Sequence, residues 1–159
     1  MASRHHHWVI WAMAMNSDNL NQSEPGRRSI ALLLLRIASA SVFLYHGSGI
    51  LFGAFSGPGP AGFAAMGHVP VAVGYLVGLA EFAGGCAILS GLLFRVGAAC
   101  IAIVMLGAVL TVHLPHGFDL SKGGMEYALT QLLLAVAFLL TGPGRLSLGC
   151  WLPPGLRKL

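Results

Sequence analysis

One carboxylate stands in the middle of an apolar, glycine-rich stretch of the chain, GYLVGLAEFAGG at residues 74–85. At 100° per residue of an α-helix, Gly74, Gly78, Glu81 and Gly85 lie within about 60° of one another. The face that carries the acid is therefore also the face on which a second backbone comes close. A carboxylate facing lipid costs roughly 2.5–3.5 kcal/mol, so we expect neighbouring helices to cover Glu81 and to pair with it.

A second charge, Arg36, lies inside another apolar stretch and shares one helix face with Ala40, Phe43 and Gly47. By helix rise, Arg36 lies about 9 Å into its stretch and Glu81 roughly 18 Å in from the same side, which leaves an axial gap of roughly 9 Å. The sequence therefore predicts an Arg36–Glu81 ion pair that holds two helices together. The alternative is that the long Arg36 side chain extends to the nearby membrane interface.

A third group of residues, near the other end of the apolar stretches, combines imidazoles with a carboxylate. Its members are His46, His113, His116, Glu126 and Tyr127. Intramembrane Glu and His side chains carry protons, so we expect Glu81 and Glu126 to handle protons. We expect His46, His113 and Tyr127 to bind a ligand, such as the carbonyl oxygens of a quinone. No metal site is predicted, because no two ligands stand at i and i+4 of one helix. The alternative for His116 and Tyr127 is that they stand at helix ends and contact only water.

These residues must be positioned by membrane-spanning helices. Hydrophobic residues make up 56% of the 159 residues and charged residues only 9%, whereas a soluble domain carries about 25% charged residues. The basic residues are scattered or stand at helix ends. We therefore expect the protein to lie in the lipid bilayer and to have no nucleic-acid partner. The sequence predicts an all-α membrane protein, a four-transmembrane-helix bundle. Its spans are expected at residues 30–52, 71–93, 96–112 and 126–140.

The connection between the first two spans, residues 53–70, contains an additional apolar segment. A Gly-Pro-Gly-Pro run at residues 57–60 breaks the first span. The following segment, AGFAAMGH at residues 61–68, is too short to cross a bilayer. We therefore predict a short interfacial or re-entrant segment between helices 1 and 2.

The segments that flank the predicted membrane domain, residues 30–145, differ from it. Residues 1–29 are expected to form a disordered extension, the alternatives being a signal peptide or a translation start at Met13 or Met15. Residues 146–159 are expected to form a tail. By the positive-inside rule, both termini are expected in the cytoplasm. The basic residues on the cytoplasmic side would be Arg27, Arg28, Arg95, Arg145, Arg157 and Lys158, against Lys122 alone on the other side.

The order and spacing of these residues resemble the DoxX family of small four-helix membrane proteins. The resembling segments are Leu35-Arg36, Phe43, His46-Gly47, Gly67, Pro70, Glu81-Phe82-Ala83-Gly84-Gly85, Gly91-Leu92, Arg95, His113, His116-Gly117-Phe118 and Gly124-Met125-Glu126-Tyr127. The resemblance implies a four-helix bundle in the bacterial cytoplasmic (inner) membrane and a role as a membrane subunit of oxidoreductase systems. Its founding members are linked to thiosulfate:quinone oxidoreduction, and other relatives to thiol stress or quinone detoxification.

Three functions are compatible with the sequence. The first is a quinone-interacting membrane subunit of an oxidoreductase or thiol-stress system. No cofactor would be bound covalently, and electrons would come from a soluble oxidoreductase partner, because Cys86, Cys100 and Cys150 form no C-x-x-C motif. The second is a small-molecule or proton-coupled transporter, in which a homodimer would enclose the path. The third is a non-catalytic structural membrane partner. The sequence leaves open the substrate and whether the chain is itself an enzyme.

Overall fold

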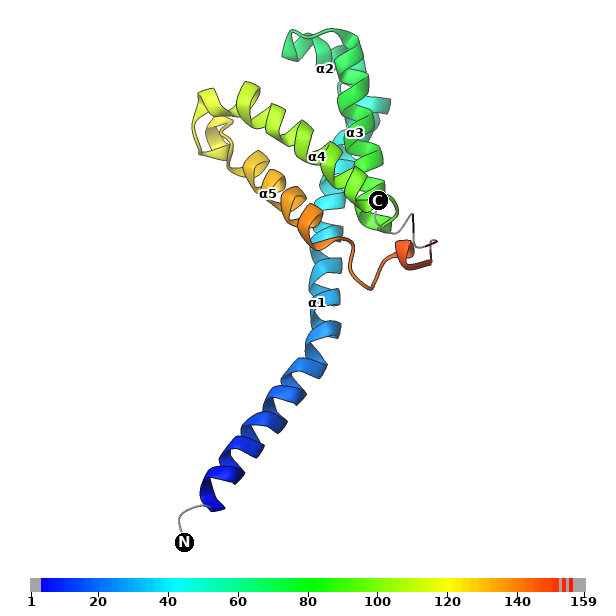
Figure 1. Cartoon of the computed structure of the whole chain (residues 1–159). Helices are drawn as coiled ribbons and strands as arrows, with labels where there is room; N and C mark the ends of the chain where they lie inside the picture. Colours follow the sequence, from blue (N-terminus) through cyan, green and yellow to red (C-terminus); the bar gives the residue numbers. More distant parts are fainter. Residues whose placement is uncertain (1–3, 152, 154, 156–159) are drawn as a thin grey trace.

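The computed structural model describes the backbone of residues 4–151, 153 and 155, and within these ranges the side chains from residue 26 onward. This part of the chain is built from helices and short turns, without a strand (Figure 1). The α-helices are α1 Arg4–Phe52, α2 Gly59–Gly67, α3 Val71–Ser90, α4 Phe94–Ala108 and α5 Glu126–Thr141. The short turns are η1 Ala54–Ser56, η2 Val109–His113, η3 Leu114–His116, η4 Leu120–Lys122 and η5 Leu148–Trp151.

The helices confirm the predicted all-α membrane bundle. Three helical segments are long and apolar enough to cross a membrane: 26–52, 71–90 and 94–116, the last continuing α4 through η2 and η3. The fourth predicted span is α5, a shorter apolar helix of 16 residues. The apolar segment predicted between the first two spans is α2, which lies beside the N-terminal end of α3 (Figure 1).

The start of α1 differs from the sequence prediction. A disordered extension was expected over residues 1–29, but the helical backbone already begins at Arg4. Glycine and proline, the residues that most disfavour a helix interior, are absent from residues 4–24, and the helix continues through Pro25. Residues 1–3 lie outside the described residues.

The turn between α3 and α4 begins earlier than the predicted end of the span at residue 93. Gly91 has φ 75°, a left-handed conformation that glycine adopts at little cost, and its N–H donates to the Ala87 carbonyl at 2.8 Å. Leu93 is also left-handed, with φ 48°. α3 therefore ends at Ser90, and its last carbonyl groups need partners from outside the helix.

α1 and α3 run antiparallel with their backbones in close contact. A Cβ added at Gly47 would overlap the Phe82 backbone nitrogen, and one added at Gly78 or Gly85 would lie 3.1 Å from a backbone nitrogen of α1. The predicted face of α3 is buried at all four of its residues, Glu81 included. The small-residue contact that the spacing indicated is thus present, and it puts Glu81 inside the bundle.

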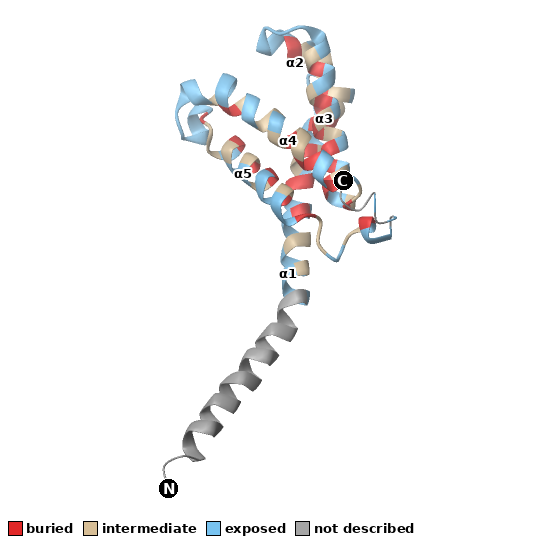
Figure 2. Ribbon diagram, viewed as in Figure 1, coloured by how far each residue is buried: buried red, intermediate tan, exposed pale blue. Residues whose placement is uncertain are grey.

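The apolar core lies toward the end of the bundle at which α3 ends and α4 begins. Rings of α4 and α5 meet there, with Phe94 and Phe138 centroids 5.4 Å apart. All four long helices contribute to this core, which consists of Ala40, Phe43, Ile88, Phe94, Ala98, Ile101, Ala135 and Phe138 (Figure 2). Toward the other end, the α4–α5 hairpin diverges from α1 and α3 (Figure 1).

Candidate functional site

Arg36 is buried at the end of the bundle where α3 ends and α4 begins, and all of its hydrogen bonds go to backbone carbonyls. Its side chain is 1% exposed. Nε donates to the Ile88 carbonyl at 2.8 Å and Nη2 to the Leu89 carbonyl at 2.6 Å. Nη1 donates to the carbonyls of Pro143 and Leu146, at 3.0 and 2.6 Å. One guanidinium thus joins the C-terminal end of α3 to the segment that follows α5.

The predicted Arg36–Glu81 ion pair is not formed. Ile88 and Leu89 carry two of the carbonyls left unsatisfied where α3 ends, and they lie beside Arg36. Glu81 lies seven residues before Ile88 on the same helix, roughly 10 Å away along its axis. Arg36 does not extend to the interface either, because its side chain stays buried.

Glu81 is buried without a partner. The residue is 6% exposed, and its Oε2 has no hydrogen-bond partner among the described residues. Within the same residues the carboxyl group takes part in no ion pair. The α3 backbone at Glu81 lies against Gly47 of α1. An intramembrane carboxyl group without a structural partner marks a place that can receive a proton or a ligand group.

His46 lines a pocket near the C-terminal end of α1. The pocket has a volume of about 380 Å³ and is bordered by α1, η1 and α2. The His46 ring is exposed and meets the Tyr45 ring edge to face at a centroid distance of 5.4 Å. Tyr45 in turn stacks on Phe55 at 5.0 Å. Ser56, Phe63 and Met66 complete the part of the lining that could touch a ligand. Among the described residues, nothing hydrogen-bonds the imidazole of His46.

The loop that forms one wall of this pocket is held in an unusual conformation. Phe55 and Ser56 have φ of 55° and 60°, in the left-handed region that residues with a side chain rarely adopt. Such residues cost of order 1 kcal/mol or more and persist only where surrounding contacts impose them. The contact here is between glycines, since a Cβ on Gly57 would overlap the backbone of Gly49. The Gly-Pro run read from the sequence as a helix breaker thus also shapes a pocket.

The remaining predicted site residues belong to the α4–α5 connection. His113 Nδ1 lies 2.8 Å from the Gly123 carbonyl, and His116 Nδ1 lies 2.8 Å from the Val112 carbonyl. Glu126 is half-buried and Tyr127 exposed at the start of α5. The histidines are therefore already engaged with the backbone of their own connection.

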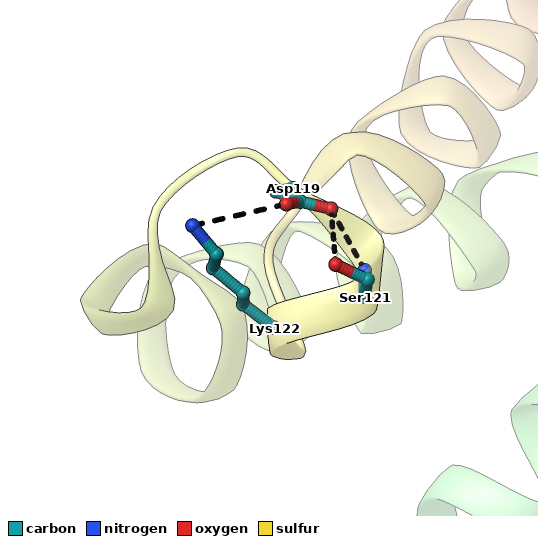
Figure 3. Close-up of polar contacts among 3 residues, drawn as sticks. All are labelled: Asp119, Ser121 and Lys122. Atoms are coloured by element: carbon teal, nitrogen blue, oxygen red, sulfur yellow. Dashed lines mark hydrogen bonds and ion pairs between the residues drawn. The ribbon is translucent and has the colours of Figure 1, made fainter.

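Asp119 organises this connection. Its Oδ1 accepts hydrogen bonds from the Ser121 backbone N–H at 2.9 Å and from the Ser121 hydroxyl at 2.8 Å (Figure 3). Its Oδ2 lies 4.0 Å from Lys122 Nζ, with both side chains more than half exposed. These contacts close the loop on itself and leave Asp119 with a structural role.

The structure divides the predicted ligand group. His46 lines a pocket with α2 and η1, whereas His113 ends η2 and Tyr127 lies in the first turn of α5. Figure 1 shows that this part of the α4–α5 hairpin diverges from α1. The sequence placed these residues at a similar depth, but the splay of the hairpin separates them sideways. The pocket instead uses Tyr45, Phe55 and Ser56, which the sequence analysis missed because an aromatic residue at a helix end is common in membrane proteins.

A model of the DoxX family matches residues 31–114 of the chain, slightly more than half of its length. The chain belongs to the DoxX family. A relative from Bacillus subtilis (strain 168), named "Putative oxidoreductase CatD", is 30% identical over 120 residues, which are 75% of this chain and 84% of the relative. No solved structure matches the chain.

The matched range of this DoxX protein runs from the membrane part of α1 to η3. It therefore includes Arg36, His46, Glu81 and His113, and it excludes Glu126 and Tyr127. The orphan carboxyl group and the histidine of the pocket both lie within the shared part of the family, on helices α1 and α3.

Proposed function

We propose that this DoxX protein is the membrane subunit of an oxidoreductase system and that the pocket around His46 binds the head group of a quinone. The proposal is supported by membership of a membrane family and by similarity to a protein named as an oxidoreductase. The observation that carries it is the placement of the His46 imidazole beside the stacked rings of Tyr45 and Phe55.

The chemistry of this lining suits a quinone. A quinone head group is flat and largely apolar, and it carries two carbonyl oxygens that accept hydrogen bonds. Tyr45 and Phe55 offer aromatic surfaces, and the unoccupied imidazole nitrogens of His46 offer a donor. A volume of about 380 Å³ lies within the range of small-molecule sites, about 300–1,000 Å³. Phe55 and Met66 are largely exposed, which gives an isoprenoid tail an apolar way out to the lipid.

The protein's own groups would handle protons, and a soluble partner would supply electrons. Reduction of a quinone to a quinol takes up two electrons and two protons. His46 is the group placed to pass a proton to a quinone oxygen. Glu81 is the one buried acid among the described residues, and its backbone lies against Gly47, the residue after His46. We assign Glu81 the exchange of protons with His46, and we leave Glu126, His113 and Tyr127 out of this site.

The basic residues give the proposed orientation. Arg95 lies in the first turn of α4 and Arg145 follows α5 at the Arg36 end, whereas Lys122 lies in the connection at the other end. By the positive-inside rule, the Arg36 end faces the cytoplasm of a bacterial inner membrane. The His46 pocket then lies toward the outer surface.

Binding of a short-chain quinone by the purified protein tests this proposal. We expect the wild-type protein in mild detergent to retain the quinone in equilibrium dialysis. Replacement of His46 by leucine should weaken binding roughly three- to tenfold, the effect of losing one hydrogen bond. His116→Leu is the matched control, because His116 is exposed and its Nδ1 lies against the Val112 carbonyl.

Two results would contradict the proposal. In the first, the wild-type protein retains no quinone, which would favour the structural role considered for this family. In the second, His46→Leu and His116→Leu weaken binding equally, which would place the quinone elsewhere. Thermal unfolding of both variants shows whether any loss of binding comes from a loss of folding.

A further inference from the structure

A second cavity lies at the opposite end of the bundle, where the C-terminal segment folds back over the end of α3. Its volume is about 770 Å³. Its walls come from α1 at Leu33, from α3 at Leu89 and from the segment between Arg145 and Trp151. Arg36 holds these elements together through its bonds to the Leu89 and Leu146 carbonyls. The cavity is therefore part of the folded structure.

Three arginines at this end of the bundle differ in their hydrogen bonds. Arg36 donates hydrogen bonds to four backbone carbonyls, and Arg95 donates one to the Leu139 carbonyl. Arg145 lines the cavity and is exposed, and its guanidinium makes no hydrogen bond or ion pair with the described residues. None of the described residues that line the cavity is acidic. The cavity thus contains one cation whose planar donors are available to a phosphate.

Besides the two arginines, Ser90 and Ser147 are the polar residues of the lining, and the other lining residues are mostly apolar. Leu33, Leu89, Leu146 and Leu148 form the walls, and Trp151 is 88% exposed at the rim. Tryptophan near the end of membrane spans is typical of the interface, where its ring lies at the level of the lipid head groups. A free inorganic anion would gain little from these walls, whereas a lipid acyl chain would pack against them.

We propose that this cavity binds an anionic phospholipid, with the phosphate on Arg145 and an acyl chain along the leucine walls. Basic pockets between helices at the cytoplasmic side of a membrane bind anionic head groups in this way. This site is separate from the His46 pocket, and its assignment does not depend on the proposed redox function.

Native mass spectrometry of the full chain in detergent tests the assignment. Dioleoylphosphatidylglycerol and dioleoylphosphatidylcholine are titrated separately onto the wild-type protein. We expect the anionic lipid to bind about fivefold more tightly, and Arg145→Gln to remove most of that preference. Arg27→Gln is the matched control: it removes one exposed charge near the same membrane surface, but Arg27 does not line the cavity, so the preference should persist.

Three outcomes would overturn the proposal. Equal binding of the two lipids would show that the cavity does not select for charge. Equal losses in Arg145→Gln and Arg27→Gln would assign the preference to the general surface charge. Displacement of the anionic lipid by a moderate excess of inorganic phosphate would show that the site takes free anions.

Discussion

Arg36 and Glu81 are two charged side chains buried on neighbouring helices of one bundle, and their surroundings are opposite. Arg36 donates four hydrogen bonds to carbonyls of α3 and of the C-terminal segment. Glu81 has a buried oxygen with no partner among the described residues. A charge with four partners is explained by the fold that it holds together. A carboxyl group with none forms no bond that the fold needs, and this is why we propose a proton-handling role for Glu81.

The same contrast separates the two ends of the molecule. At the Arg36 end, all four long helices meet in the apolar core, and Phe94 packs on Phe138. At the other end, the hairpin of α4 and α5 diverges, and the loop at Phe55 and Ser56 holds a left-handed conformation beside a pocket. The apolar core is concentrated at one end, and the strained loop beside the His46 pocket lies at the other.

Removal of the Arg36 side chain tests this difference between the two charges most directly. Arg36→Ala leaves the Ile88 and Leu89 carbonyls at the end of α3, and the Pro143 and Leu146 carbonyls of the C-terminal segment, without their donor in a largely buried place. We expect a loss of about 3–5 kcal/mol in unfolding free energy, because each buried carbonyl left without a donor costs about 1–3 kcal/mol. Unfolding of the purified protein in mixed detergent micelles measures it.

Arg145→Ala is the control for the Arg36 experiment. It removes the same side chain at the same end, but Arg145 is exposed and its guanidinium bonds to none of the described residues. Its effect should stay within about 0.5 kcal/mol. A similarly small effect for Arg36→Ala would mean that the four hydrogen bonds of Arg36 do not hold α3 and the C-terminal segment together.

The contact between α1 and α3 provides the next largest effect. Gly47→Val puts a branched side chain where even a Cβ overlaps the Phe82 backbone, so the helices must move apart. We expect a loss of about 1–3 kcal/mol, in the range of overpacked cores. Gly107→Ala is the control, because nothing lies within 4 Å of a Cβ added there. It should be neutral or stabilise α4 by up to about 1 kcal/mol, and equal losses in the two variants would contradict the close contact.

Much of this arrangement could be predicted from side-chain types and their periodicity. Hydropathy placed the membrane-spanning helices, and the spacing of Gly74, Gly78 and Gly85 around Glu81 predicted a buried face, which the structure confirms. These predictions succeed because a helix repeats every 3.6 residues and because a bilayer leaves few alternatives to apolar helices.

The partner of Arg36 could not be predicted in the same way. Every residue has a backbone carbonyl group. The residue types therefore do not indicate which carbonyl groups accept hydrogen bonds from Arg36. The acceptors became available because Gly91 ends α3 at Ser90, three residues before the predicted end. The grouping of His46 with His113 failed for a different reason. Hydropathy fixes depth along a span, but it does not predict which helices diverge sideways.

Glu81→Gln should have a smaller effect on stability than Arg36→Ala or Gly47→Val, and it tests whether the two buried charges depend on each other. A carboxyl group without a partner loses no structural bond when an amide replaces it, so we expect a change within about 1 kcal/mol. The combined Arg36→Ala and Glu81→Gln variant should then show the sum of the two single effects within about 0.5 kcal/mol. A larger coupling would restore the ion pair that the sequence suggested. Additivity would show that the two buried charges are not coupled and that the fold tolerates the unpaired carboxyl group of Glu81.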